Sequence, residues 1–262
     1  MPAPSRLLSV AAILLVFPGT ASGQKFAGHR LEVGQGTVLI VPDQATGLTL
    51  WATRETRPGH RPSPDFVGWF DPDSIAPWVA QTRLLLGQSP PAAGDGLEAA
   101  PLIAADRGRV SLFLVGDSTD RPFLLSFGHP SERQRWVIEA TAGEIGRLLD
   151  TLGVLATRSH FAPPSGLGYA NPTHRSATPD RDPGSRSPDV AAQGPGEVWA
   201  TAELDSTGTV IGGTSRVLWA DPAALAGRVL AVLPGYRYHR RDGGRPARLA
   251  IYQRFRVRGK RE

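Results

Sequence analysis

The chain has 262 residues and a formal net charge of +5, and hydrophobic residues make up 40% of it against 20% charged residues. This balance is typical of a folded globular protein and excludes a chain that is mostly disordered or mostly embedded in a membrane. Because the chain has no cysteine, disulfide scaffolds, thiolate zinc sites, iron–sulfur clusters and cysteine nucleophiles are excluded as well.

The first 23 residues are typical of a signal peptide. Arg6 supplies a positive charge, Leu7 to Phe17 is apolar apart from Ser9, and small residues follow up to Gly23. The apolar run is too short to cross, as a helix, a hydrocarbon core about 30 Å thick. We therefore expect export with cleavage after Gly23. An uncleaved segment that anchors the protein in the inner membrane is the alternative.

A unit over residues 26–156 is predicted to be rich in β-strands. Runs of β-branched and aromatic residues, bounded by Gly, Pro and Asp, predict strands at Thr37–Val41, Leu48–Thr53, Phe66–Phe70, Val110–Val115, Pro122–Phe127 and Trp136–Ala140. In the second of these, Leu48 and Leu50 alternate with Thr49 and Trp51. This alternation predicts a strand with one buried face and one exposed face.

Two helices are predicted to pack on the sheet of this unit. The first opens at Asp73 or Ser74, with Pro77 in its first turn, where proline is tolerated. The second opens at Thr141, which forms a capping box with Glu144. Neither helix carries a motif that indicates what this unit does.

One motif of this unit resembles a catalytic block. Gly116-Asp117-Ser118 follows an apolar strand, as does the nucleophile block of GDSL-type hydrolases. That family also needs an aspartate three residues before a histidine, and none of the six histidines has one. A turn between two strands accounts for the same residues. A serine hydrolase built on Ser118 is therefore kept only as a minor alternative, and no cofactor or metal is predicted.

Residues 157–195 are predicted to be a disordered, flexible linker. Pro, Gly, Ser, Ala, Asn and Asp dominate this segment, which has no apolar periodicity. Such a segment cannot bury enough apolar surface to offset the entropy lost on ordering it.

Residues 196–262 are predicted to form a small second unit. It carries twelve Arg or Lys against six Asp or Glu, so the positive charge of the chain belongs here. In chain order the pattern predicts a strand at Val198–Leu204, a turn at Asp205–Gly208, the start of a returning strand at Thr209–Ile211, a helix capped by Asp221, and a last strand at Leu249–Val257.

These blocks resemble the C-terminal domain of TonB-type energy transducers. The resemblance covers residues 196–257 and rests on GEVWATAELDSTGTV, DPAALAGRVLAVL, GYRYHRR and GGRPARLAIYQRFRV. It implies a periplasmic α+β domain with a three-stranded antiparallel sheet and one helix. It also implies that the domain binds the N-terminal box of an outer-membrane receptor as an added strand, in support of transport across the outer membrane.

The resemblance further implies that the partner peptide lies along the last strand, near two tyrosines. The residues expected at this site are Tyr236, Tyr238, Leu249, Ile251, Tyr252, Arg254 and Phe255. The aliphatic residues and the phenylalanine among them would be core residues in any such domain. The chain departs from the family because its first segment is typical of a cleaved signal and a folded unit replaces the spacer, so energy coupling does not follow.

A different class of function stays open beside this one. An exported, envelope-associated structural or interaction protein would use the basic C-terminal unit for oligomerisation or for contact with an anionic surface. Export argues against nucleic acid as a partner. On either interpretation we expect a binding protein that is not an enzyme.

Overall fold

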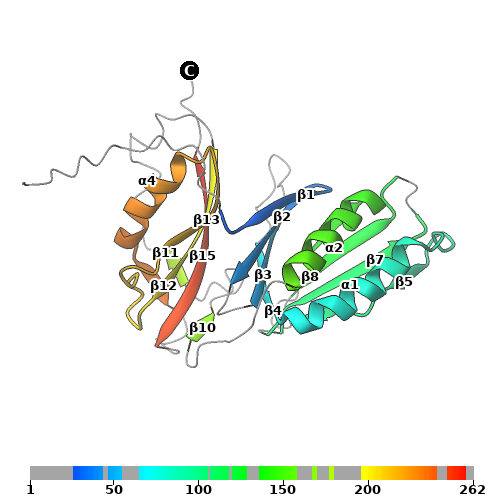
Figure 1. Ribbon diagram of the computed structural model, residues 1–262, viewed down its shortest axis with the longest axis horizontal. Helices are drawn as coiled ribbons and strands as arrows, with labels where there is room; N and C mark the ends of the chain where they lie inside the picture. The colour runs from blue at the N-terminus through cyan, green and yellow to red at the C-terminus, as the bar shows by residue number, and fades with distance from the viewer. Residues whose placement is uncertain are drawn as a thin grey trace, which may run out of the picture.

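The computed structural model describes residues 26–43, 47–54, 65–105, 107–117, 120–128, 136–157, 167–169, 177–179, 196–240 and 247–257. Within these ranges the chain is an α+β protein in which antiparallel sheets predominate (Figure 1). The predicted signal peptide lies outside them. No helix in the described part of the chain is both long enough and apolar enough to cross a membrane.

The first sheet is an antiparallel meander of four consecutive strands. They are β1 (His29–Val33), β2 (Gly36–Asp43), β3 (Gly47–Arg54) and β4 (Phe66–Phe70), in that spatial order. The sequence predicts the last three of these. It misses β1, HRLEV, in which Leu31 and Val33 alternate with Arg30 and Glu32 but which has only two apolar residues among its five.

The second sheet follows the first helix. Its strands are β5 (Gly96–Glu98), β6 (Leu102–Ile103), β7 (Arg109–Val115), β8 (Phe123–Gly128) and β9 (Trp136–Ala140), and both β5 and β6 pair with β7. The three long strands match the predicted ones to within one residue. β5 and β6 are too short for a period of two to be recognised in the sequence.

The two predicted helices are present. α1 (Pro72–Leu86) begins one or two residues before the expected start, because the Asp71 side chain caps it by accepting a hydrogen bond of 3.0 Å from the Asp73 N–H. α2 (Ala142–Ala156) begins at the predicted capping box of Thr141 and Glu144. Both helices share one core with the inner face of the second sheet and one face of the first sheet.

The C-terminal sheet has the strand order β10, β15, β12, β13. Its long strands β12 (Gly196–Leu204) and β15 (Arg248–Val257) pair antiparallel along nearly their whole length, and β13 (Arg216–Asp221) flanks β12. α4 (Leu225–Val232) and the short 3₁₀ turn η2 (Leu233–Gly235) cover one face of this sheet. The three antiparallel strands and the helix occur in the predicted chain order.

Two details of the predicted C-terminal unit are wrong. The returning strand is β13 and not Thr209–Ile211, in which Thr209 and Val210 form isolated bridges only. The helix begins at Leu225 because Asp221 is extended, paired with Glu197 at the end of β13, and so does not cap it. The predicted turn is present: Gly208 has φ +83°, and a Cβ there would lie 1.9 Å from a backbone oxygen.

The predicted linker contributes two short strands to the C-terminal unit. β10 (Leu167–Tyr169) pairs parallel with the start of β15, and β11 (Ala177–Pro179) pairs antiparallel with β14 (Tyr238–Arg240). The prediction that this segment lacks secondary structure is therefore wrong at these six residues. The rest of residues 158–195 lies outside the described ranges.

The first sheet is the middle layer of the molecule. In Figure 1 it lies between the C-terminal sheet, which carries α4 on its far side, and the pair of helices α1 and α2. As a result both faces of β3 and β4 are buried, including Thr49, Trp51 and Trp69. The prediction of one exposed face for β3 is wrong, because a second unit, distant in sequence, covers that face.

Candidate functional site

The candidate site is β15 with its surroundings, where the sequence places the partner peptide. Side chains of β15 alternate between two faces of the C-terminal sheet. Leu249 and Ile251 point toward α4 and lie in the core beneath it, together with Tyr236 and Tyr238. Phe255 is half-buried against the same core, and its ring meets that of Tyr236 edge-on at 5.7 Å.

Tyr252 points the opposite way, into an apolar interface with the first sheet. Its hydroxyl accepts a hydrogen bond of 3.0 Å from the indole Nε1 of Trp69. Its ring meets that of Trp51 edge-on at 5.6 Å, and the Trp51 ring lies 4.6 Å from that of Trp199. Four aromatic side chains from two units of the chain therefore form one buried cluster.

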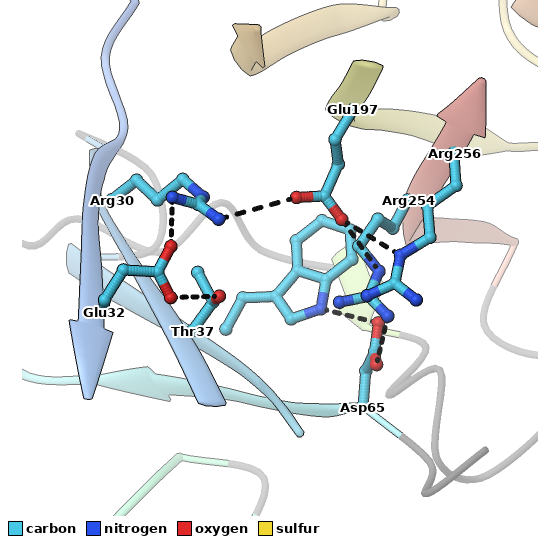
Figure 2. A network of polar contacts seen from close by, with 8 residues as sticks. Arg30, Glu32, Thr37, Asp65, Glu197, Arg254 and Arg256 are labelled. Atoms are coloured by element: carbon cyan, nitrogen blue, oxygen red, sulfur yellow. Dashed lines mark hydrogen bonds and ion pairs between the residues drawn. The ribbon is translucent and has the colours of Figure 1, made fainter. Parts of the chain in front are cut away.

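Arg254 also faces the first sheet, where it belongs to a polar network at the rim of the aromatic cluster (Figure 2). Its guanidinium lies 3.8 Å from the Asp65 carboxylate and 3.4 Å from that of Glu197. Asp65 also accepts a 3.1 Å hydrogen bond from the Trp51 indole. Arg256 pairs with Glu197 at 3.3 Å from the outer side. The side chains of Arg254 and Asp65 are only 15% and 18% exposed.

The network continues to the edge of the first sheet. Arg30 lies 4.0 Å from Glu197 and also pairs with Glu32, which accepts a 3.0 Å hydrogen bond from the Thr37 hydroxyl. Figure 2 shows Arg30 from the first sheet and Arg254 and Arg256 from the C-terminal sheet all directed toward Glu197. Carboxylates and guanidiniums therefore alternate from Asp65 through Arg254, Glu197 and Arg30 to Glu32, and this series of ion pairs joins the two units.

Burial controls the electrostatics of this network. Loss of hydration raises the pKa of Asp65 above its ordinary value of 3.8, and the nearby charge of Arg254 opposes this rise. Burial also lowers the pKa of Arg254, against the attraction of Asp65. Glu197 acts on the same pair: its charge favours the charged form of Arg254 and disfavours that of Asp65.

The structure shows where the side chains of the expected contact residues lie. The expected contact residues are folded into the core beneath α4 or into the interface with the first sheet, so their side chains do not present a free surface to a partner. For Leu249, Ile251 and Phe255 the sequence already indicates core positions, whereas the residue types of the tyrosines and Arg254 fit either role. The sequence also gives no signal for Asp65 and Glu197, the acids that hold Arg254.

The backbone edge of β15 is a separate feature of the same strand. The N–H and C=O of Glu203 point toward the β13 side, where they bond the Thr214 hydroxyl and the Ile211 N–H. Because backbone groups alternate along a strand, Ala202 and Leu204 bond β15 instead. Ile251 stands opposite Ala202, so its backbone N–H and C=O point toward β12. Ala250, Arg254 and Arg256 direct their backbone groups away from it.

β10 takes up one end of this outer edge. It pairs with Arg248–Ala250 and runs parallel to β15. Among the strands that the structure describes, none pairs with Gln253–Val257 on that side. The opposite edge of the sheet receives one bond of 2.9 Å, from the Gly28 N–H to the Leu218 carbonyl of β13. The chain thus contacts both edges of its own C-terminal sheet.

Ser118, the nucleophile of the hydrolase alternative, lies outside the described residues. The neighbouring Asp117 accepts a 2.7 Å hydrogen bond from the Gly94 N–H, and Gly116 is packed against the carbonyls of Pro91 and Ala92. These contacts belong to a turn after β7. No group of three or more metal-ligating side chains occurs among the residues that were placed.

Neither the models of known protein families nor the curated proteins include a match to this chain.

Proposed function

We propose that the chain is an exported, periplasmic TonB-like protein that binds an extended peptide of an outer-membrane receptor as an added strand on the outer edge of β15. The function is binding and not catalysis. The proposal differs from the first expectation in one respect. The partner is held by backbone groups of Gln253–Val257, and the buried side chains of the strand support that edge from behind.

One observation carries this proposal. β15 has ten residues and is matched over nine of them by β12, whereas on the other side the described strands match only three. An edge of about five residues is the length of an ordinary strand. In strand addition, the affinity comes from such a row of outward N–H and C=O groups.

The edge is also held in place. Arg254 and Tyr252 anchor β15 to the first sheet, and Leu249 and Ile251 anchor it to the core beneath α4. A rigid edge binds more tightly than a mobile one because less conformational entropy is lost on binding. The contact between the two units therefore supports a binding role for the C-terminal sheet.

The alternative of a basic surface for anionic partners receives less support. Arg248 pairs with Glu203, Arg254 with Asp65, and Arg256 with Glu197. Arginines whose charge is already matched by neighbouring carboxylates contribute little to an attractive field at the surface. The net positive charge of the C-terminal unit is thus a weaker guide than the position of its arginines.

The test compares two substitutions of Arg256, whose backbone N–H points to the outer edge. Arg256→Pro removes that donor, and Arg256→Ala removes only the charged side chain. Synthetic peptides spanning the N-terminal boxes of the producing cell's outer-membrane receptors are titrated against the exported chain by isothermal calorimetry. We expect Arg256→Pro to weaken binding about tenfold or more, since it removes one interface hydrogen bond and clashes with the added strand, and Arg256→Ala to weaken it less than about threefold.

Circular dichroism of both variants serves as the control for folding. Equal losses in the two variants, together with a strong gain of wild-type binding at low salt, would favour the electrostatic alternative. Proline at Ile251 is not suitable for this test, because the N–H of that residue bonds β12 and its loss would disrupt the sheet itself.

A further inference from the structure

We propose that β10 is a built-in competitor for the partner edge of β15, so that the chain regulates its own strand addition. This inference rests on the proposed function. It concerns Leu167–Tyr169, which lies in a segment whose composition predicts no structure and which nevertheless pairs with Arg248–Ala250.

The register identifies the residue of β10 that makes the bonds. Gly168 stands opposite Leu249, and the backbone groups of the residues on either side of Leu249 face outward. In a parallel pair, a bonding residue makes its two hydrogen bonds to the residues on either side of the one that stands opposite it. The Gly168 N–H therefore donates to the Arg248 carbonyl, and the Gly168 carbonyl accepts from the Ala250 N–H. Leu167 and Tyr169 direct their backbone groups away from β15.

This pairing is suited to displacement. It spans three residues, whereas ordinary strands have five or six, and a parallel ladder is slightly weaker per residue than an antiparallel one. Its bonding residue is a glycine, which loses the most backbone entropy on ordering. A partner strand limited to Gln253–Val257 can bind beside β10, but a longer one that reaches Ala250 must replace it.

Competition of this kind lowers the apparent affinity by the fraction of molecules whose edge is free. A short partner strand would be insensitive to β10, and a long one would bind only after β10 has left. The chain would thus discriminate between partner segments by their length along β15, a property that the edge alone does not provide.

Two variants of the full exported chain change the occupancy of the edge in opposite directions. Gly168→Pro removes the bonding N–H of β10, and Leu167→Pro is its matched control because the N–H of Leu167 points away from β15. For the closed state, Leu167→Cys with Arg248→Cys joins two residues that stand opposite each other. The chain has no cysteine of its own, so a single disulfide forms and dithiothreitol reverses it.

The first readout is independent of any partner. Hydrogen exchange of the Ala250 amide should accelerate at least about tenfold in Gly168→Pro and remain unchanged in Leu167→Pro. The Ile251 amide, which faces β12, should stay protected in both. Equal Ala250 exchange in Gly168→Pro and the wild type would overturn the inference, because β10 would then not occupy the edge.

The second readout uses the receptor-box peptides of the proposed function, in versions of five and ten residues. For the longer peptide we expect binding about threefold to thirtyfold tighter in Gly168→Pro and at least about tenfold weaker in the oxidised double-cysteine variant, with recovery on reduction. The shorter peptide should bind all variants alike. Equal binding of the longer peptide by every variant would overturn the competition and leave the proposed function intact. Absence of binding in every variant would overturn the proposed function and, with it, the role of β10.

Discussion

Arg254 links the two units of the chain through ion pairs. It reaches two carboxylates, Asp65 of the N-terminal unit and Glu197 of its own sheet, and lies 5.6 Å from the Trp199 ring. A largely buried ion pair of this kind adds little net stability relative to an apolar pair, but removal of one partner leaves an uncompensated charge. Its value to the protein lies in fixing how the two sheets face each other.

We expect Arg254→Met to lower the free energy of unfolding by about 3 kcal/mol at neutral pH, because it leaves Asp65 buried without its principal cation. The double variant Asp65→Asn with Arg254→Met should recover part of this loss. Urea unfolding of the wild type, the single variant and the double variant measures the difference. A single variant as stable as the wild type would show that the pair is not effectively buried.

The same variant should have a distinctive pH dependence. Burial raises the folded-state pKa of Asp65 above the ordinary value of 3.8 that applies in the unfolded chain. At a pH between the unfolded-state pKa and the folded-state pKa, the native state therefore holds a proton that the unfolded chain has released. The contribution of Asp65 to stability therefore falls as pH rises through this window and is constant above it. Without Arg254 the pKa rises further and the window extends to higher pH.

The loss caused by Arg254→Met should consequently be smaller at acidic pH, where the raised pKa favours protonated Asp65 in the variant, and complete at pH 8. Urea unfolding at intermediate pH values follows the change, with the double variant as the reference that lacks the titrating group. A loss that is the same at all pH values would contradict this assignment.

At the scale of a single element, α2 is held by its first turn. Glu144 accepts hydrogen bonds from the N–H and hydroxyl of Thr141 at 2.8 and 3.1 Å, and from the Gly34 N–H at 3.2 Å. Burial alone would raise the pKa of Glu144, but these bonds and the nearby Arg121 outweigh it and lower that pKa below 4.5. One carboxylate thus caps the helix and ties it to the turn between β1 and β2.

We expect Glu144→Gln to lower the free energy of unfolding by about 1 kcal/mol at neutral pH, since an amide has only one oxygen to replace two bonding oxygens. Because the folded-state pKa is lowered, the stabilisation by the charge is present above 4.5 and is lost as pH falls through the folded value. The difference from the wild type should shrink accordingly in thermal unfolding below pH 4.5. Glu139→Gln, an exposed change of equal charge on β9, is the control and should have little effect.

At the scale of the whole molecule, the two units behave as one packed body. The first sheet buries one face against α1 and α2 and the other against the C-terminal sheet, with Trp51, Trp69 and Trp199 at the centre of the second contact. Gly28 bonds β13 from the N-terminal side, which adds a backbone link. Stability gained at the interface is therefore shared by both units.

We expect the wild type to unfold in a single transition, and Trp51→Ala to uncouple the C-terminal sheet from the rest. Truncation of a fully buried tryptophan costs about 3 to 5 kcal/mol, here at the interface. Hydrogen exchange should then show β12 losing protection before β7. Trp136→Ala opens a cavity beside Phe127 in the N-terminal core. It should lower the midpoint of unfolding while β12 and β7 still lose protection together. Unchanged protection of β12 in Trp51→Ala would mean that the units are merely tethered.

Features that depend on neighbours in the chain could be predicted from the sequence. The capping box of Thr141 and Glu144 and the turn at Asp205–Gly208 both arise from hydrogen bonds within four residues. The long strands were predictable for a related reason, since their β-branched and aromatic residues favour extended backbone wherever they lie. The chain order of strands and helix in the C-terminal unit followed from these elements, whereas its three-stranded antiparallel sheet was implied by the family resemblance.

Features that depend on distant residues were decided by the tertiary structure. Trp51 is buried because Trp199 and Tyr252 cover it, and Arg254 points inward because Asp65 lies across the interface. Alternation along a strand shows that two faces differ, but it does not show what each face meets. For the same reason Leu167–Tyr169 forms a strand although its composition predicts none, because the edge of β15 offers hydrogen-bond partners to its backbone.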